Sequence, residues 1–229
     1  MAMVEKIKKN LEEIKNDIKN IRGENSGVKV VCASKYTDGQ GIVDIINAGI
    51  EYIGENRVQA MKDKREYLET LKLEEKIAWH FISNLQKNKI KYIIDYVDLI
   101  QSVHEYSLLE ELDKKASQKG RILNVLLEVN ISGEESKHGF EREELLNLGE
   151  KLVSFSNVRI KGLMTMAPNT EDLDIVRGTF RGLREFRDEL NQKIFNGALT
   201  ELSMGMSNDY RIALEEGATI IRIGTRLFN

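Results

Sequence analysis

The segment ILNVLLEV at residues 122–129 is the clearest strand in the sequence, and the pattern that decides the fold starts there. A helix is expected over residues 143–153 (EELLNLGEKLV), and another apolar strand follows at 159–164 (RIKGLM). A strand, a helix and a second strand in this order predict a βαβ unit whose two strands run parallel.

The same alternation extends from this unit in both directions. Further short apolar strands are expected at residues 28–34, 52–54, 78–82, 99–103, 201–203 and 219–223. Helices are expected at residues 39–48, 56–70, 90–94, 108–119, 173–191 and 209–216. Eight strand–helix repeats at a mean spacing of roughly 27 residues predict an α/β protein with a (β/α)₈ TIM barrel, which normally takes ~250 residues. The alternative is an open doubly wound sheet, but no G-x-G-x-x-G motif follows the first strand.

The composition narrows the class of protein. A chain of 229 residues forms one large domain or two small ones, and no Pro- or Ser-rich linker divides it, so we expect one domain over residues 1–229. The formal net charge of −3 argues against nucleic-acid binding by bulk charge. The single cysteine, Cys32, excludes an intramolecular disulfide and a cysteine-based metal cage. No apolar run approaches the ~20 residues that cross a bilayer, so we expect a soluble, cytoplasmic protein.

Residues 1–23 form an amphipathic pattern. Apolar side chains recur in steps of four and three at Ile7, Leu11, Ile14, Ile18 and Ile21. This spacing predicts a helix that ends near Gly23 and packs one face on the barrel. The alternative is a helix on a membrane surface, but acidic residues interrupt its basic face. Charged residues throughout the segment also argue against a targeting signal.

Polar residues and glycines gather where the expected strands end. In a (β/α)₈ barrel the active site lies at the carboxyl ends of the strands. Lys35 follows the first strand and Asn56 the second, while the loop 203–207 follows the seventh strand and Gly224 the eighth. This arrangement is typical of a ligand site.

Lys35 is the residue with the most distinctive chemistry. Side chains alternate along a strand, so Lys35 shares a face with Val31 and Ala33. A lysine above small apolar side chains is expected to lose water, which favours the uncharged amine that forms a Schiff base. The alternative for Lys35 taken alone is a strand-end lysine whose ammonium reaches water.

The loop after the seventh expected strand resembles a phosphate cradle. It runs Ser203-Met204-Gly205-Met206-Ser207 and is followed by Asn208 and Asp209, which are good helix N-cap residues. Barrels often hold phosphate in the loops after strands seven and eight, so we expect an anion there and on Gly224 and Thr225. The alternative is an ordinary turn before a helix.

Arg222 and His80 are the remaining polar residues expected inside the barrel. Arg222 shares a face with Gly224 and needs an acceptor, either in a buried salt bridge or in a ligand. His80 is more readily explained as a hydrogen-bonded core histidine than as a catalytic residue. Asn56 is either a ligand contact or the N-cap of the second helix. His104 and His138 are too scattered to form a metal site with His80.

The methionines at two strand ends leave two explanations open. Met164, Met166, Met204 and Met206 either line a pocket with soft apolar surface or fill the top of the barrel. Cys32, in the middle of a strand, is expected in the core.

Eight blocks of this sequence resemble the pyridoxal phosphate homeostasis protein family, the YggS/PROSC group. The blocks are residues 33–35 (ASK), 53–59 (IGENRVQ), 79–89 (WHFISNLQKNK), 129–132 (VNIS), 137–140 (KHGF), 162–166 (GLMTM), 202–207 (LSMGMS) and 221–225 (IRIGT). They run in the family's order over nearly the whole chain. Two departures are Ser83 and Asn229, each at a position where the family usually has glycine.

The resemblance implies a barrel like the N-terminal domain of alanine racemase, with pyridoxal 5′-phosphate bound as a Schiff base on Lys35. It implies that the phosphate lies on the 203–207 loop, Gly224 and Thr225. It also implies that Arg222 faces the pyridine nitrogen and that Asn56 lies near the ring hydroxyl. His80, Met164, Met204 and Met206 complete the set of cofactor-binding residues that we expect, and no metal is expected.

The resemblance further implies a monomer that holds and supplies the cofactor, with apo pyridoxal-phosphate enzymes as recipients and with neither nucleic acid nor membrane as partner. No catalytic residue is expected, because a cation at the pyridine nitrogen weakens the electron sink that amino-acid chemistry needs. The second domain of the racemases is expected to be absent, which leaves the cofactor open to water. The alternative function is a racemase or decarboxylase that uses Lys35.

Overall fold

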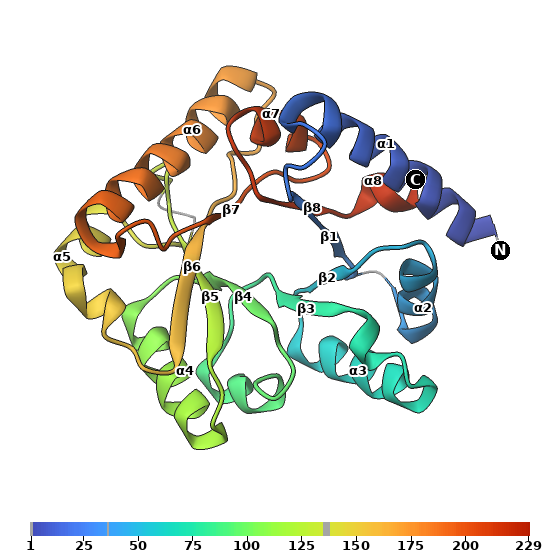
Figure 1. The fold of residues 1–229 in the computed structure, drawn as a ribbon, viewed down its shortest axis with the longest axis horizontal. Coiled ribbons are helices and arrows are strands. Elements are labelled where there is room, and N and C mark those ends of the chain that lie inside the picture. Colours follow the sequence, from blue (N-terminus) through green and yellow to red (C-terminus); the bar gives the residue numbers. More distant parts are fainter. Residues whose placement is uncertain (1, 36, 135–137) are drawn as a thin grey trace.

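The chain folds into a closed barrel of eight parallel strands surrounded by helices (Figure 1). The computed structural model describes residues 2–35, 37–134 and 138–229. The strands pair in sequence order and β8 closes the barrel on β1. They are β1 (Lys29–Ala33), β2 (Tyr52–Glu55), β3 (Ala78–Phe81), β4 (Leu99–Val103), β5 (Leu123–Glu128), β6 (Val158–Met164), β7 (Glu201–Ser203) and β8 (Ile220–Ile223). The prediction of a (β/α)₈ barrel is therefore confirmed.

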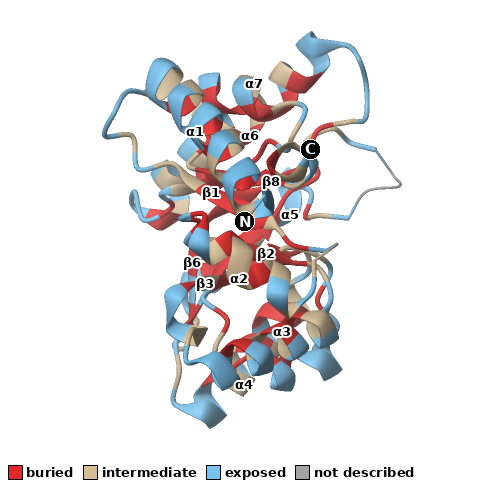
Figure 2. Cartoon of the chain, turned by 90° about the vertical axis from the view of Figure 1, so that its right-hand side faces the viewer, coloured by how far each residue is buried: buried red, intermediate tan, exposed pale blue. Residues whose placement is uncertain are grey.

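Alternation along the strands divides the core into two parts. A small apolar cluster lies in the barrel interior, and its members are Val31, Leu99, Leu126, Met164 and Ile220. The opposite faces of the strands pack under the helices in a much larger cluster that includes Cys32. Figure 2 shows the buried residues along the strands and on the inner faces of the helices. Burial raises the pKa of the Cys32 thiol to about 12, so Cys32 is a core residue as expected.

Except for α8, which was not predicted, the helices that cover the barrel begin and end near the predicted positions. They are α1 (Ala2–Arg22), α2 (Gly39–Asn47), α3 (Val58–Leu71), α4 (Tyr106–Lys119), α5 (Arg142–Leu148), α6 (Leu173–Leu190), α7 (Tyr210–Glu215) and α8 (Thr225–Phe228). The long helix expected over 143–153 was wrong in its second half. Gly149 adopts φ +50°, which ends α5, and a 3₁₀ helix continues to Val153.

The segment between β3 and β4 also differs from its prediction. A 3₁₀ helix at Lys87–Tyr92 replaces the α-helix expected over 90–94. Its backbone bonds join residues three apart, as in Lys89 N–H to Gln86 O (2.9 Å). Six residues form only two such turns. Ile90 within this helix, and Ile93 and Ile94 after it, are buried.

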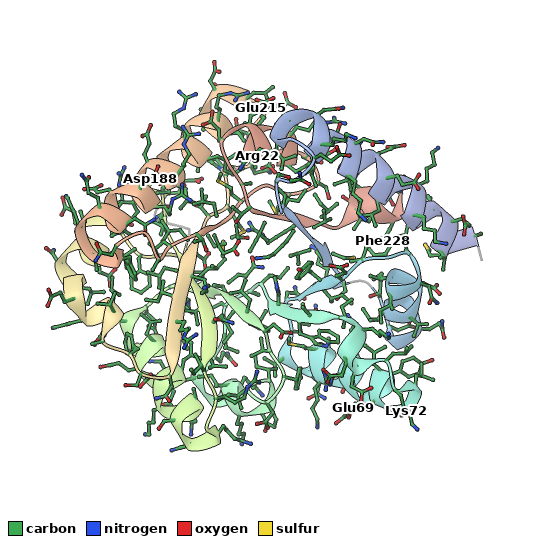
Figure 3. The ribbon with its side chains drawn as sticks, in the orientation of Figure 1. Arg22, Glu69, Lys72, Asp188, Glu215 and Phe228 are labelled. Atoms are coloured by element: carbon green, nitrogen blue, oxygen red, sulfur yellow. The ribbon has the colours of Figure 1, made fainter. Side chains whose placement is uncertain are left out.

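Helix α1, at the N-terminus, packs against helices near the C-terminus. Its apolar stripe (Ile7, Leu11, Ile14 and Ile18) is buried, and α1 packs against α7 and α8. Asn10 donates to the carbonyl of Leu227 (3.1 Å), and Arg22 donates to the carbonyl of Leu214 (3.2 Å). Figure 3 shows Arg22 beside the end of α7 that carries Glu215. We predict that residues 1–229, including α1, form a single domain, and this remains a prediction.

Strands β6 and β7 approach each other too closely for any side chain at Gly162. A Cβ atom there would lie 1.9 Å from the carbonyl oxygen of Glu201. We therefore expect Gly162→Ala to lower the free energy of unfolding by about 1–3 kcal/mol, because the barrel must open to admit the methyl group. Urea unfolding followed by circular dichroism measures the change.

Gly178 provides the matched control. It lies inside α6, and a Cβ there meets no atom within 4 Å. Gly178→Ala should raise the free energy of unfolding by about 0.5–1 kcal/mol through helix propensity. Equal effects of the two substitutions would contradict the close approach of β6 and β7.

Candidate functional site

Lys35 lies at the carboxyl end of β1, on the rim of the barrel. Ser34 continues the pairing of β1 with β2, because its N–H donates to the carbonyl of Gly54 (3.0 Å), and Lys35 follows in a turn. The Lys35 side chain is exposed. The exposure of Lys35 agrees with the alternative of a strand-end lysine rather than with partial desolvation above Val31 and Ala33, because β1 ends before Lys35.

A buried ion pair fixes the backbone on both sides of this rim. Lys64 reaches in from α3 and donates to the carboxylate of Glu55 and to the carbonyl of Ser34 (2.8 Å). The Ser34 hydroxyl also donates to Glu55 (3.1 Å), and the other Glu55 oxygen accepts from Asn56 N–H (2.8 Å). Glu55 and Lys64 therefore hold the residues that precede Lys35 and Asn56.

Sequence reasoning assigned no role to Glu55, Lys64 or Gln101. A signal for the pair was available, since a glutamate at the end of a buried strand needs a cationic partner. Which lysine supplies the charge depends on how α3 packs, and this was not readable from the sequence.

Arg222 lies inside the barrel at the head of a chain of hydrogen bonds. It donates to the Ser203 hydroxyl (2.5 Å) and to the carbonyl of Thr165 (3.0 Å). Ser203 donates to Gln101 (2.6 Å), whose amide nitrogen lies 2.8 Å from His80 Nδ1. The expectation that Arg222 needs acceptors inside the barrel is met by Ser203 and Thr165.

Burial sets the charge states along this chain. It lowers the pKa of Arg222 to about 10, against the opposing effects of Asp209 and Glu128, so Arg222 stays cationic at pH 7. Burial, followed by the charge of Lys29, lowers the pKa of His80 to about 3. A neutral imidazole can accept at Nδ1 from Gln101, which fits the core histidine expected for His80. Burial also raises the pKa of Glu128. The charges of His104, Arg222 and His138 oppose this shift.

The loops after β7 and β8 meet at Ser207. Its hydroxyl accepts from the N–H groups of Gly224 (3.2 Å) and Arg226 (3.4 Å). Gly205 adopts φ +89°, and a Cβ there would lie 2.5 Å from Ala213 Cβ, so only glycine keeps the loop against α7. The structure thus brings together the loop 203–207 and Gly224, the two elements expected to hold phosphate.

The four methionines at the strand ends differ in where their side chains lie. Met164 lies in the barrel interior, whereas Met204 has no exposed surface and packs in the core outside the barrel. The Met204 side chain therefore points away from the proposed site, because the position after the inward-facing Ser203 faces the helices. Met166 and Met206 are exposed. The Lys137 of the expected KHGF block lies outside the described residues.

Asn56 gives a test of whether a pyridoxal ring fits this rim. Its side-chain oxygen Oδ1 is buried and accepts no hydrogen bond within the part of the chain that the structure describes. A buried acceptor without a partner costs about 1–3 kcal/mol, so a donor is expected beside it. The ring hydroxyl of pyridoxal 5′-phosphate is such a donor. Arg57, not Asn56, occupies the N-cap position of α3, so Asn56 is not the cap of this helix. The residues present fit the cofactor.

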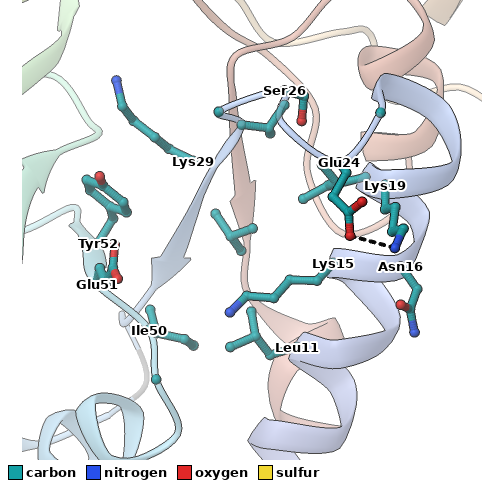
Figure 4. A pocket seen from close by; sticks show the side chains of 16 residues that line it. Leu11, Lys15, Asn16, Lys19, Glu24, Ser26, Lys29, Ile50, Glu51 and Tyr52 are labelled. Atoms are coloured by element: carbon teal, nitrogen blue, oxygen red, sulfur yellow. Dashed lines mark hydrogen bonds and ion pairs between the residues drawn. The ribbon is translucent and has the colours of Figure 1, made fainter.

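A cavity of 420 Å³ lies at the opposite end of the barrel (Figure 4). It is enclosed by α1, the amino end of β1 and the turn before β2, and the Lys15 side chain extends into it. Lys19 forms an ion pair with Glu24 at its edge (2.7 Å). Since Lys35 and Asn56 follow the carboxyl ends of their strands, this cavity is separate from the candidate site.

Metal binding and membrane crossing both bear on the class of site. Among residues 2–35, 37–134 and 138–229, no three His, Cys, Asp or Glu side chains are arranged to bind a metal ion. None of the helices described is both long and apolar enough to cross a bilayer.

Comparisons with known proteins identify the family. The family model "Alanine racemase, N-terminal domain" matches residues 6–229. A pyridoxal phosphate homeostasis protein of Aquifex aeolicus is 45% identical over 229 residues, covering 100% of this chain and 98% of its own. A protein of the same name from Vibrio cholerae is 33% identical and covers 97% and 95% of the two chains.

Solved structures agree with this match. PipY of Synechococcus elongatus PCC7942, solved with PLP bound, superposes with a TM-score of 0.87 at 33% identity and covers 97% of this chain and 100% of its own. Alanine racemase of Clostridium difficile 630 has a TM-score of 0.73 at 13% identity over 56% of its chain, a likeness of fold alone. The chain belongs to the alanine racemase N-terminal domain family and, within it, to the pyridoxal phosphate homeostasis proteins.

The buried His80 predicts a pH dependence of stability. The folded pKa of His80, about 3, lies below the ordinary histidine pKa of 6.5, so the unfolded chain binds a proton first as the pH falls. The stabilisation is complete above pH 6.5 and decreases as the pH falls from 6.5 towards 3, by up to about 1.4 kcal/mol per pH unit. In His80→Asn this contribution to the slope should disappear. Urea unfolding at several pH values between 4 and 7 measures both slopes, and identical slopes would contradict the assignment.

Proposed function

We propose that this protein binds pyridoxal 5′-phosphate through Lys35 and supplies it to other enzymes rather than catalysing a reaction itself. The observation that carries the proposal is the meeting of three features on one rim. These are the exposed residue Lys35, the Asn56 oxygen, which accepts no hydrogen bond from the described residues, and the paired loops at Ser207 and Gly224. Lys35 follows β1, which pairs with β2 on one side and with β8 on the other.

Each residue has a distinct part in binding. When bound, the cofactor supplies an aldehyde, with which the Lys35 amine condenses to form a reversible carbon–nitrogen double bond and water. The loop 203–207, Gly224 and Thr225 offer backbone N–H groups and hydroxyls to the phosphate. Asn56 Oδ1 accepts from the ring hydroxyl, and Arg222 lies on the side of the pyridine nitrogen.

The charge of Arg222 supports the supply role over catalysis. Enzymes that perform amino-acid chemistry with this cofactor depend on its capacity as an electron sink. A cation at the ring nitrogen disfavours protonation of that nitrogen and weakens the sink. Arg222 is cationic at pH 7 and is held by Ser203 and Thr165, so it cannot easily turn away. A racemase or decarboxylase is the alternative that this feature disfavours.

The names of the relatives support the same role. Proteins similar over their whole length are called pyridoxal phosphate homeostasis proteins, and a similar solved structure contains PLP. We further propose a cytoplasmic monomer, with apo pyridoxal-phosphate enzymes as recipients of the cofactor.

Covalent attachment can be tested directly. We expect protein mixed with pyridoxal 5′-phosphate and reduced with borohydride to gain one pyridoxyl group, mapped to Lys35 by peptide mass spectrometry. Lys35→Ala should lose this modification. The control Lys87→Ala removes an exposed lysine that pairs with Glu105 and should keep it. Modification of other lysines in wild-type protein with none on Lys35 would refute the attachment.

Transfer tests the supply role separately from binding. Loaded protein mixed with an apo pyridoxal-phosphate enzyme should restore that enzyme's activity faster than the same protein reduced with borohydride, whose cofactor cannot leave. Loaded protein that restores no more activity than the reduced form would count against supply. Turnover of an amino acid that disappears in Lys35→Ala would favour the racemase or decarboxylase alternative.

A further inference from the structure

A second concave site lies on the same end of the barrel as Lys35, between α3 and the 3₁₀ helix Lys87–Tyr92. We call it the rim groove, and it has a volume of 610 Å³, within the range of small-molecule sites. Its lining residues are Asn56, Arg57, Val58, Gln59, Lys62, Phe81, Asn84, Gln86, Lys89 and Tyr92. Of the residues proposed to bind the cofactor, only Asn56 lines it.

The charge of the rim groove is all of one sign. Arg57, Lys62 and Lys89 line it, and none of its lining residues is a carboxylate. Lys62 pairs with Glu66 at 3.4 Å one turn along α3, but both side chains are largely exposed, so this pair holds the lysine weakly. Three cations in one concavity, with no carboxylate among the lining residues, favour an anionic ligand.

The start of α3 adds to this preference. The helix has 14 residues and begins at the groove, with Arg57 as N-cap and no side-chain cap. It has no acidic residue in its first turn. Unsatisfied N–H groups and the positive end of the helix dipole therefore face the same space as the cations. A phosphate group suits such a helix start.

The other walls of the groove fit a planar ring. Tyr92 is exposed, and Lys89 Nζ lies 5.8 Å from the centre of its ring. Phe81 lies in the wall as a buried aromatic residue. The side-chain amides of Gln59, Asn84 and Gln86 can donate to and accept from the edge of a heterocycle. An aromatic face beside cations and amides is a typical surface for a nucleobase.

We propose that the rim groove binds a phosphate-bearing small molecule with a planar ring, of the mononucleotide class. The phosphate binds at the start of α3 with Arg57 and Lys89, and the ring stacks on Tyr92. This site is separate from the one on Lys35, and it meets the cofactor only at Asn56.

Calorimetric titration with AMP tests the site in protein whose cofactor has been fixed on Lys35 by borohydride, and also in protein without cofactor. With the cofactor fixed, its own phosphate-binding loops are filled, so AMP can bind only elsewhere. We expect saturable binding of AMP, with adenosine and inorganic phosphate each binding at least ten times more weakly. The double variant Arg57→Gln/Lys89→Gln should weaken AMP binding at least tenfold and still take up cofactor on Lys35.

Lys114→Gln is the matched control, since it removes one exposed helical lysine on α4 away from the groove, and it should bind AMP as wild type does. Tyr92→Leu should weaken AMP more than it weakens inorganic phosphate. AMP binding that is unchanged in the double variant, or absent at millimolar concentration, would overturn the proposal. Equal affinity for AMP and phosphate would overturn the assignment of a ring.

Discussion

The arrangement of the rim depends on the buried ion pair between Lys64 and Glu55. Removing two charges from water costs several kcal/mol for each ion, and the cost is recovered only when every donor and acceptor is satisfied. Here Glu55 accepts from Lys64, the Ser34 hydroxyl and Asn56 N–H, while Lys64 also donates to Ser34 O. The pair thereby ties the ends of β1 and β2 to α3. Lys35 follows Ser34 and Asn56 follows Glu55, so this network of hydrogen bonds holds both residues on one rim. The rim groove at the start of α3 lies beside them.

The interior of the barrel is organised around a second buried charge, that of Arg222. Its hydrogen bonds to Thr165 and Ser203 connect β8 with β6 and β7, and the chain continues through Gln101 to His80. A neutral His80 suits a chain that already contains a guanidinium, because a second positive charge would repel it in a medium of low dielectric. Strands β7 and β8 are therefore connected by hydrogen bonds on their inner faces. The loops that follow these two strands are connected in turn by the hydrogen bond from Gly224 N–H to the Ser207 hydroxyl.

The sequence predicted the strands well because each is short and apolar between turn residues. Leu99–Val103 and Glu201–Ser203 were predicted with their observed bounds, and the barrel follows from eight repeats. Contacts between segments far apart in the sequence were harder to predict, as Lys64 with Ser34 and Gln101 with Ser203 show. The reason is that hydrophobic periodicity does not reveal which residues of distant segments pack together. The exposure of Lys35 was left open between two alternatives for a similar reason: alternation holds only while the strand continues. The outward Met204 could have been predicted from the alternation that places Ser203 inward.

An exposed lysine also suits supply better than catalysis. In the proposed function, water breaks the carbon–nitrogen double bond to Lys35, so release of the cofactor needs solvent at this residue. Enzymes that use such a bond benefit from excluding water, which strengthens the electrostatic interactions in the site and protects reactive species. Lys35 lies beyond the end of β1, whereas Arg222 and the Ser203 hydroxyl are buried within the barrel. In the proposed function, the site therefore combines a buried floor, formed by Arg222 and Ser203, with an exposed rim at Lys35. A ligand in the rim groove would sit beside that exposed rim, next to Asn56, where it can contact the holding site without entering it.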